Sequence, residues 1–139
     1  MRDIEFRGKR KADGKWVYGF YYKKCGRHII LGDIMPDSDM QREFEVIPET
    51  VGEFTSLPDK KSKRIYENDI ARTELGRLGI VRFSHGMFGI EWINYIENQD
   101  MVGSWGQLHN LRRMDDGFNG NVEIIGNIHD NPELLEAKP

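Results

Sequence analysis

The chain has 139 residues, which is the length of one ordinary domain. Its hydrophobic content of 38% can form a core, while its charged content of 31% is too high for a membrane protein. No apolar run reaches the roughly 20 residues that span a bilayer, and the first residues lack the apolar segment of a secretory signal. A single cysteine, Cys25, excludes an internal disulfide framework, so we expect a cytoplasmic protein.

The formal net charge of −3 is unevenly distributed along the chain. Residues 1–30 contain nine Lys or Arg and three Asp or Glu, a net charge of +6, so the remainder carries −9. This asymmetry has three interpretations: a basic hairpin beside an acidic sheet in one domain, self-association, or a face that binds nucleic acid.

The N-terminal part reads as strands separated by turns. Residues 2–7 alternate in polarity and predict a half-buried strand, and Asp13-Gly14 favours a hairpin turn. Lys15–Tyr22 predicts the next strand. One side of that strand carries Trp16, Tyr18, Phe20 and Tyr22, and the other carries Val17, Gly19 and Tyr21.

A second hairpin is predicted directly after it. Cys25-Gly26 indicates a turn and residues 28–31 a short apolar strand. Residues 33–40 have the composition of a loop. Residues 43–47 alternate again, and Pro48 should end that strand because proline cannot donate to the ladder.

In the second half of the chain, residues 59–64 predict a charged turn. Four strands are predicted, at residues 65–70, 80–83, 88–92 and 122–128. Residues 97–121 are irregular in composition. Asn131-Pro132-Glu133 has the features of a helix start, so a short C-terminal helical turn should pack Leu134 and Leu135 on the sheet.

The hairpin of residues 80–92 should supply core side chains. On its second strand, Phe88, Ile90 and Trp92 share one parity and are predicted to face the core, while Gly89 and Glu91 face away. No window shows a helical period, so the pattern favours an all-β roll or small barrel.

Three segments resemble the YopX family of bacteriophage and prophage proteins: EFRGKRKADGKWVYG, IPETVGEFTSLPDKKSKRIYENDI and EIIGNIHDNPELL. The resemblance covers both ends and the middle of the chain. It implies an SH3-type β-roll in the C-terminal part and no established biochemical activity. We therefore expect a mostly β chain, with an N-terminal β-hairpin region over 1–47 and an SH3-like roll with a C-terminal tail over 48–139, folded as one compact unit.

The chain departs from the family pattern at Ser56, Ser62 and Asn68, where glycine is usual. Glycine at such positions supplies a positive φ. Asparagine tolerates this conformation best, so Asn68 is the mildest departure. Serine at position 62 is a less obvious substitute, which puts the geometry of the turn at 59–63 in question.

The sequence contains no pattern typical of an enzyme, a metal site or a cofactor site. None of the four histidines has a partner at metal-ligand spacing; they are His28, His85, His109 and His129. Glu67 and Asp69 would share one face of a strand. We expect these carboxylates to lie on a solvated face of the sheet and not to act as an acid–base pair. Asp69 could accept hydrogen bonds from backbone N–H groups. Motifs for nucleophiles, phosphate loops and dinucleotides are also absent from the sequence, so we predict no enzyme activity and no cofactor.

The remaining candidate is a binding surface on the N-terminal hairpin. Its predicted residues are Trp16, Tyr18, Tyr21, Arg10, Lys11 and Lys15. We expect a phage or prophage accessory protein that binds an unknown phage or host protein in the cytoplasm of a bacterial host. The alternative is a nucleic-acid-binding accessory factor that uses the basic hairpin. Because the charges divide and one strand has aromatics on both faces, we also expect a homo-oligomer, most simply a dimer, with this hairpin at its interface.

Overall fold

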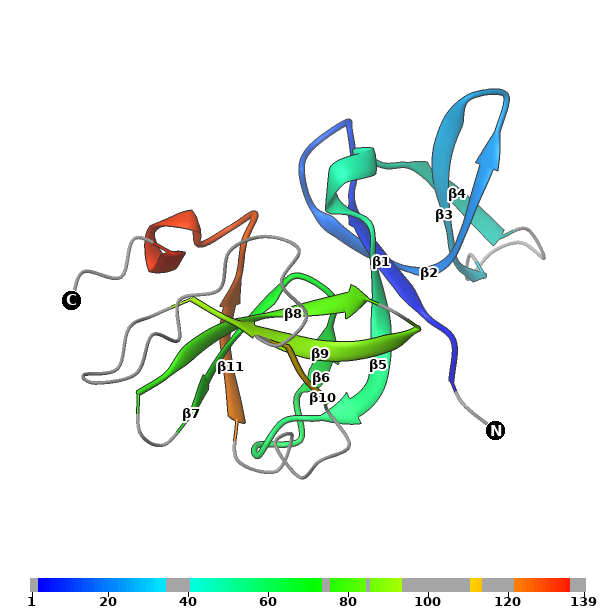
Figure 1. Cartoon of the computed structure of the whole chain (residues 1–139). Helices are drawn as coiled ribbons and strands as arrows, with labels where there is room; N and C mark the ends of the chain where they lie inside the picture. The colour runs from blue at the N-terminus through cyan, green and yellow to red at the C-terminus, as the bar shows by residue number, and fades with distance from the viewer. Residues whose placement is uncertain are drawn as a thin grey trace. The chain divides into compact units, whose positions relative to one another are not determined.

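The structure is a computed structural model that describes residues 3–34, 41–73, 76–84, 86–93, 111–113 and 122–135. The strands are β1 (Phe6–Lys9), β2 (Trp16–Lys24), β3 (Arg27–Ile34), β4 (Gln41–Glu45), β5 (Gly52–Pro58), β6 (Arg64–Tyr66), β7 (Asp69–Thr73), β8 (Leu78–Ser84), β9 (Met87–Trp92), β10 (Leu111–Arg113) and β11 (Val122–Asn127). Two 3-10 turns, η1 (Pro48–Thr50) and η5 (Pro132–Leu135), complete the described elements (Figure 1). The prediction of a mostly β chain with a short C-terminal helical turn is confirmed.

The chain divides into two compact units, unit 1 (Met1–Phe54) and unit 2 (Thr55–Pro139). The sequence placed its division after Ile47. In the structure, β4 ends at Glu45 and Pro48 begins η1, after which the first residues of β5 pair with β1. The two units are described separately below.

Unit 1 is an antiparallel sheet in the order β4-β3-β2-β1, with the start of β5 beside β1 (Figure 1). Both predicted hairpin turns are present. Gly14 has φ 72° in the longer β1–β2 loop, and Cys25 and Gly26 have φ 52° and 77°, the two positive values that a two-residue hairpin turn requires. The first turn is closed by a hydrogen bond from Gly14 N–H to the Arg10 carbonyl, 2.8 Å.

A close backbone approach fixes the middle of β2. A Cβ atom placed on Gly19 would lie 1.9 Å from the carbonyl oxygen of Leu31, and φ there is +155°. Only glycine avoids this overlap. Neighbouring side chains of a strand project to opposite faces, so Tyr18 and Phe20 share the face of β2 opposite to that of Gly19, and Phe20 lies opposite Leu31 in the register.

The buried apolar side chains of unit 1 are few. Ile29, Ile30, Val46 and Phe54 are buried, and Val46 also packs within 3.3 Å of the position that a Cβ on Gly8 would take. A bridge between Arg10 and Val46 places the residue after β4 against the end of β1.

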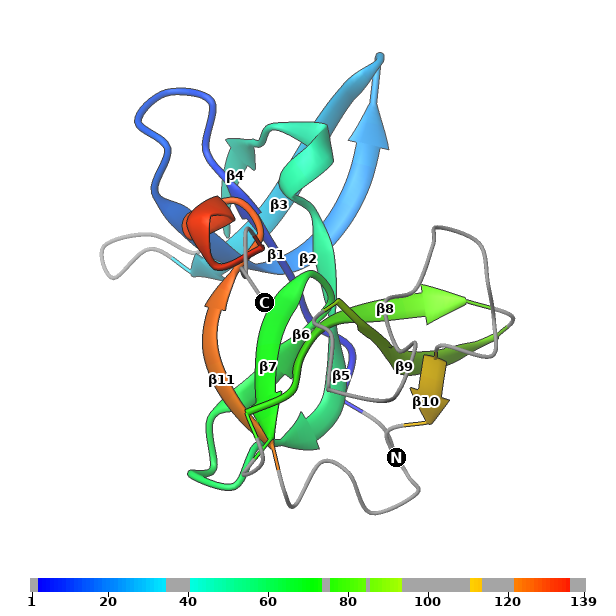
Figure 2. The ribbon, with the colours of Figure 1, turned by 60° about the vertical axis from the view of Figure 1, so that its left-hand side comes forward.

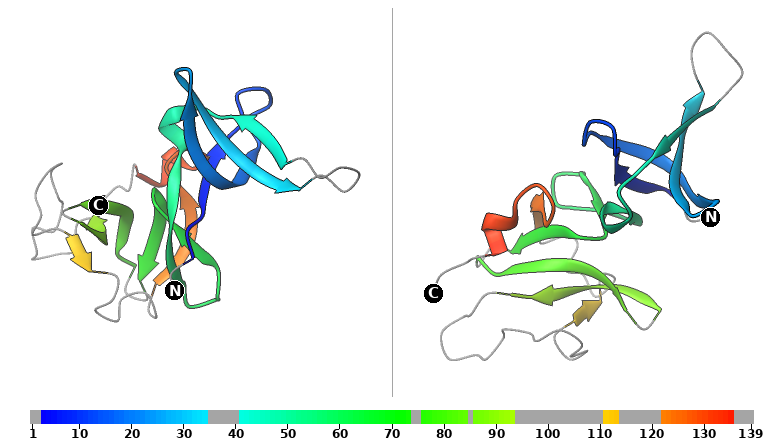
Figure 3. Two further views of the ribbon diagram at one scale, coloured as in Figure 1. Left: turned by 90° about the vertical axis from the view of Figure 1, so that its right-hand side faces the viewer. Right: turned by 90° about the horizontal axis from the view of Figure 1, so that it is seen from above.

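Unit 2 contains an antiparallel sheet in the order β10-β9-β8-β7-β11 (Figure 2). The predicted hairpin is confirmed as β8 and β9, which run side by side in Figure 3, with Val81 opposite Ile90 and Phe83 opposite Phe88. Val122–Asn127 forms the predicted last strand and pairs with β7. Of the predicted irregular stretch 97–121, only β10 lies within the described residues.

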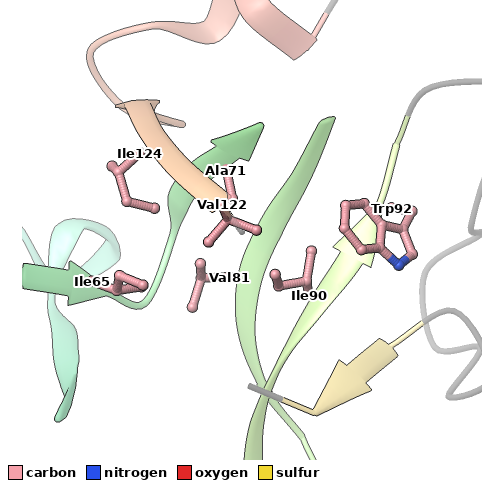
Figure 4. Packing of buried hydrophobic residues seen from close by; sticks show 7 residues of the cluster. All are labelled: Ile65, Ala71, Val81, Ile90, Trp92, Val122 and Ile124. Atoms are coloured by element: carbon pink, nitrogen blue, oxygen red, sulfur yellow. The ribbon is translucent and has the colours of Figure 1, made fainter. Parts of the chain in front are cut away.

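The core of unit 2 is a cluster of seven buried side chains: Ile65, Ala71, Val81, Ile90, Trp92, Val122 and Ile124 (Figure 4). The predicted inward positions of Ile90 and Trp92 are confirmed, and Phe88 packs against this cluster while remaining partly exposed. Gly79 allows the close packing, because a Cβ there would lie 2.3 Å from Ile90 Cγ2.

The opposite face of the same hairpin is also buried, which corrects the expectation that one face lies outward. The register places Glu91 beside Ile80 and Gly89 beside Arg82, away from the cluster as predicted. Yet Ile80 and Glu91 are 4% and 8% exposed. Glu91 tolerates this burial because Arg82 Nε lies 3.5 Å from its Oε2.

The predicted single strand 65–70 is two strands, β6 and β7, separated by a turn at Glu67-Asn68. Asn68 has φ 73°, which breaks the extended conformation. The sequence also did not predict β5. Ser56, with φ 71°, interrupts the regular alternation that would have indicated it.

Candidate binding surfaces

The central candidate surface in unit 1 is the row of aromatic side chains on β2. Tyr18 is 42% exposed and Phe20 is 58% exposed, although both are large apolar residues in the middle of a sheet. Both side chains project from the same face of β2, because they are two positions apart in the strand. Phe20 was not among the predicted site residues, although it shares the parity of Trp16 and Tyr18 in the sequence.

Trp16 lies at the start of the same row and is partly buried beneath two cations. The Arg7 guanidinium carbon is 4.6 Å from the centroid of the indole and Lys9 Nζ is 5.4 Å from it. The register explains both contacts, because Lys9 lies opposite Trp16 and Arg7 lies opposite Tyr18 on β1. Cations at these distances from an aromatic face are attracted by the ring quadrupole.

Tyr21 does not belong to this surface. Its hydroxyl lies 2.5 Å from His28 Nδ1, its ring stacks on the His28 ring, and the other side of the ring meets Phe6 with centroids 5.7 Å apart. Tyr21 is therefore a structural residue that joins β2 to β1 and β3. His28, for which the sequence indicated no metal-ligand partner, bonds to Tyr21.

The remaining predicted residues lie in the β1–β2 hairpin loop, where the structure brings Arg10 and Lys11 to β4. The Arg10 guanidinium carbon is 4.8 Å from the centroid of the Phe44 ring, and Lys11 Nζ is 3.1 Å from Glu45 Oε2. These four residues line an open hollow. Lys15 is exposed, and its backbone N–H donates to Asp13 Oδ1, 3.0 Å away.

The sequence did not identify the contribution of β4 to this hollow. The Arg42 guanidinium carbon lies 4.9 Å from the Phe44 ring centroid, so the ring contacts two guanidinium groups. On the same strand, the Glu43 carboxylate accepts a short hydrogen bond from the Tyr22 hydroxyl, and this bond raises the pKa of Tyr22. The alternation of β4 was visible in the sequence, but its pairing with β3 and the loop was not.

The charge asymmetry of the sequence is reduced within unit 1. Residues 1–54 contain ten Lys or Arg and ten Asp or Glu, so their formal net charge is zero. The cations of the hairpin loop are paired locally, as Lys11 is with Glu45 and as Arg10 is with Asp13 at 3.4 Å. This arrangement agrees with the interpretation of a basic hairpin beside acidic residues in one domain.

The carboxylates singled out in unit 2 do not form a reactive pair. Asp69 is 2% exposed, and its Oδ2 accepts a hydrogen bond from Tyr66 N–H at 2.7 Å, which is the structural role expected of it. Glu67 lies in the turn before it. Asn68 Oδ1 accepts a bond from Arg82 Nη1 at 2.7 Å, and burial lowers the pKa of this guanidinium while Glu91 partly restores it.

Within the described ranges, no three His, Cys, Asp or Glu side chains are grouped as a metal site requires. Cys25 is exposed at the β2–β3 turn, and His85 and His109 lie outside the described residues. No described helix has the length and apolar character needed to cross a bilayer.

Three comparisons place this fold among known proteins. No curated protein matches the chain. A solved structure, the crystal structure of protein EF1440 from Enterococcus faecalis, is similar with a TM-score of 0.55 and 20% sequence identity, over 97% of this chain and 99% of that one. At this identity the likeness concerns the fold alone. The family model described as YopX protein matches residues 5–136, nearly the whole chain, and the protein therefore belongs to the YopX family.

Proposed function

We propose that the protein is a phage or prophage accessory protein without catalytic activity, and that it binds another protein in the cytoplasm of a bacterial host. The observation that carries the proposal is the exposure of Tyr18 and Phe20 on β2. Exposed aromatic side chains that are fixed by a sheet are typical anchors of protein–protein interfaces, since they lose little conformational entropy on binding.

The chemistry of the surrounding surface supports a protein partner. Arg7 and Lys9 lie against the Trp16 ring, and the unit as a whole has no net charge. Attraction to phosphates through this face would be weak. We propose that the partner buries Tyr18 and Phe20 in an apolar pocket and that Lys9, beside the Trp16 ring, lies at the rim.

We propose that unit 2 is an SH3-like roll and that it serves as the scaffold of the molecule. The alternative function, nucleic-acid binding through the N-terminal hairpin, is less favoured because Arg10 and Lys11 are paired with carboxylates.

Affinity capture from lysogenic or infected cells tests the proposal. The double variant Tyr18→Ser with Phe20→Ser should lose the partner that the unchanged protein retains. Phe83→Ser is the matched control, because Phe83 is a similarly exposed aromatic, at 49%, on unit 2. Retention of every partner by the double variant would overturn the proposal.

Self-association through the same strand is the simplest form of this interaction, and we propose that the protein forms a dimer in the absence of its partner. Sedimentation of the unchanged chain at low and high salt should show a dimer in both, because an apolar interface is insensitive to ionic strength. The double variant should sediment as a monomer. A monomeric unchanged chain at high protein concentration would contradict the dimer and would leave the hetero-interaction to the capture experiment.

A further inference from the structure

The turn between β5 and β6 is held rigidly against β11 by one buried carboxylate. Asp59 is 5% exposed; its Oδ1 accepts hydrogen bonds from the N–H groups of Lys61 and Lys63, both at 2.8 Å, and its Oδ2 accepts one from Ile124 N–H at 3.0 Å. Lys60 N–H also donates to the Val122 carbonyl, at 3.0 Å. The backbone of the turn is therefore fixed beside the start of β11, as Figure 2 shows.

This anchoring leaves the lysine side chains of the turn on the surface. Ser62 takes the left-handed conformation, with φ 65°, so that the loop closes over only a few residues. Burial raises the pKa of Asp59, but the three amide donors outweigh it and lower the pKa below its usual value. The carboxylate is thus ionised and turned inward, while Lys60, Lys61 and Lys63 are exposed.

Three cations from two elements meet at a single carboxylate on β11. Glu123 Oε1 lies 2.9 Å from Lys61 Nζ, and Glu123 Oε2 lies 3.4 Å from Arg72 Nη2 and 4.0 Å from Lys60 Nζ. The hydrogen bond from Lys61 lowers the pKa of Glu123, as does the one from Arg72. One carboxylate cannot neutralise three cations, so positive charge remains at this surface.

The excess charge extends along the turn. Lys63 is exposed at the end of the turn, which brings the basic surface to four residues: Lys60, Lys61, Lys63 and Arg72. Two further arginines of the sheet contact other groups: Arg77 lies over the Trp92 ring at 4.2 Å, and Arg82 lies beside Glu91. Unit 2 carries a net charge of −3, with ten Lys or Arg and thirteen Asp or Glu, so this surface differs in sign from the unit that bears it.

We propose that this basic surface binds the phosphate backbone of double-stranded DNA. The reason is charge complementarity on a pre-formed array: the cations are spread over a rigid turn and a neighbouring strand, as a repeating row of phosphates requires. The one aromatic residue of β6, Tyr66, is buried, and β7 and β11 carry none, so these strands offer no ring on which bases of a single strand could stack. The inference goes beyond the proposed protein-binding function and concerns a different unit.

Fluorescence anisotropy of a labelled duplex of about 20 base pairs, titrated with the full chain at several salt concentrations, tests the inference. Because each neutralised phosphate contributes about 0.9 to the slope of log K against log salt, four contacts predict a slope between about −2.5 and −3.6. The double variant Lys61→Gln with Lys63→Gln should lose about two in slope and at least about tenfold in affinity near 0.1 M salt.

The matched control is Lys23→Gln with Lys24→Gln, which removes the same charge from exposed positions at the end of β2 in unit 1. We expect binding by this variant to stay within about twofold of the unchanged chain, since its residues lie outside the proposed surface. Equal losses in both double variants would show that only net charge matters and would overturn the assignment.

Glu123→Gln gives a result that partial unfolding cannot imitate. Removing the carboxylate frees Lys61 and Arg72 for phosphates, so the variant should bind the duplex several-fold more tightly, with a slope steeper by about one. Unchanged or weaker binding would contradict the proposal. If a single strand of equal length bound more tightly than the duplex, the assignment to double-stranded DNA would be wrong. If a polyglutamate peptide bound and the duplex did not, the surface would be assigned to acidic proteins instead.

Discussion

The two units stabilise their sheets by different means. Unit 2 buries a continuous apolar cluster that includes the large ring of Trp92. Unit 1 buries few apolar side chains, and two of its rings contact guanidinium groups, Trp16 that of Arg7 and Phe44 those of Arg10 and Arg42, as Trp92 of unit 2 contacts that of Arg77. Beside the small core of unit 1, two aromatic side chains of one strand, Tyr18 and Phe20, are exposed together, whereas Phe83 is the exposed large apolar side chain among the described residues of unit 2. This difference explains why the proposed protein contact lies on unit 1 and the proposed DNA contact on unit 2.

The largest expected effect tests the apolar core of unit 2. Ile90→Ala should lower the free energy of unfolding by about 2–5 kcal/mol, because Ile90 is fully buried in the cluster and the truncation leaves a cavity. Phe83→Ala on the facing strand should cost less than about 1 kcal/mol, since its ring is half exposed. Denaturant unfolding measures both. Equal losses would mean that the cluster does not dominate the stability of the unit.

The corresponding test in unit 1 concerns backbone packing. Gly19→Ala should destabilise the protein by about 1–3 kcal/mol or more, because the new methyl group would overlap the Leu31 carbonyl. Gly14→Ala is the control at another positive φ, with no atom within 4 Å, and should cost only about 1–2 kcal/mol of backbone strain. If the Gly14 variant proved the less stable of the two in thermal unfolding, the close approach at β2 would not be a determinant of the fold.

Asp59 predicts a dependence of stability on pH that belongs to unit 2. Its pKa is lowered in the folded state, so its contribution is complete above the unfolded value of about 3.9 and is lost as pH falls through the folded pKa. Asp59→Asn should cost about 1–3 kcal/mol at neutral pH, because an amide cannot accept all three backbone bonds.

The stability difference between Asp59→Asn and the unchanged protein should then shrink as pH falls below about 4, which urea unfolding at neutral and acidic pH would reveal. If the difference in the free energy of unfolding between the two proteins stayed constant from neutral to acidic pH, the charge of the Asp59 carboxylate would play no part in holding the turn.

The smallest expected effect is a gain. Ser62→Gly should stabilise the protein by up to about 1 kcal/mol, since glycine relieves the strain of a positive φ at some cost in unfolded-state entropy. Ser84→Gly, in the regular strand β8, should instead lose about 0.5–1 kcal/mol. A loss in both variants, measured by thermal unfolding, would mean that the Ser62 side chain contributes more than its backbone conformation costs.

The sequence by itself determined the features that depend on near neighbours. The hairpin of β8 and β9, the turns at Asp13-Gly14 and Cys25-Gly26, and the η5 turn after Asn131 all follow from alternation and turn residues within a few positions. The inward parity of Ile90 and Trp92 follows in the same way, because a strand's side chains alternate regardless of what packs on it.

Only the tertiary structure decided the features that join distant parts of the chain. Arg72 and Glu123 are 51 positions apart, and Asp59 and Ile124 are 65 apart, so the basic surface and its anchor cannot be recognised from any one segment. From the sequence, Glu91 was predicted to face away from the core. Alternation assigns a side chain to one face of the strand, but it does not show whether other residues cover that face. Tyr21 looked like part of a binding surface until the pairing of β2 with β3 brought His28 to its hydroxyl. Local preferences set each strand, whereas pairing between strands decides which side chains meet, and the candidate sites of this protein depend on the latter.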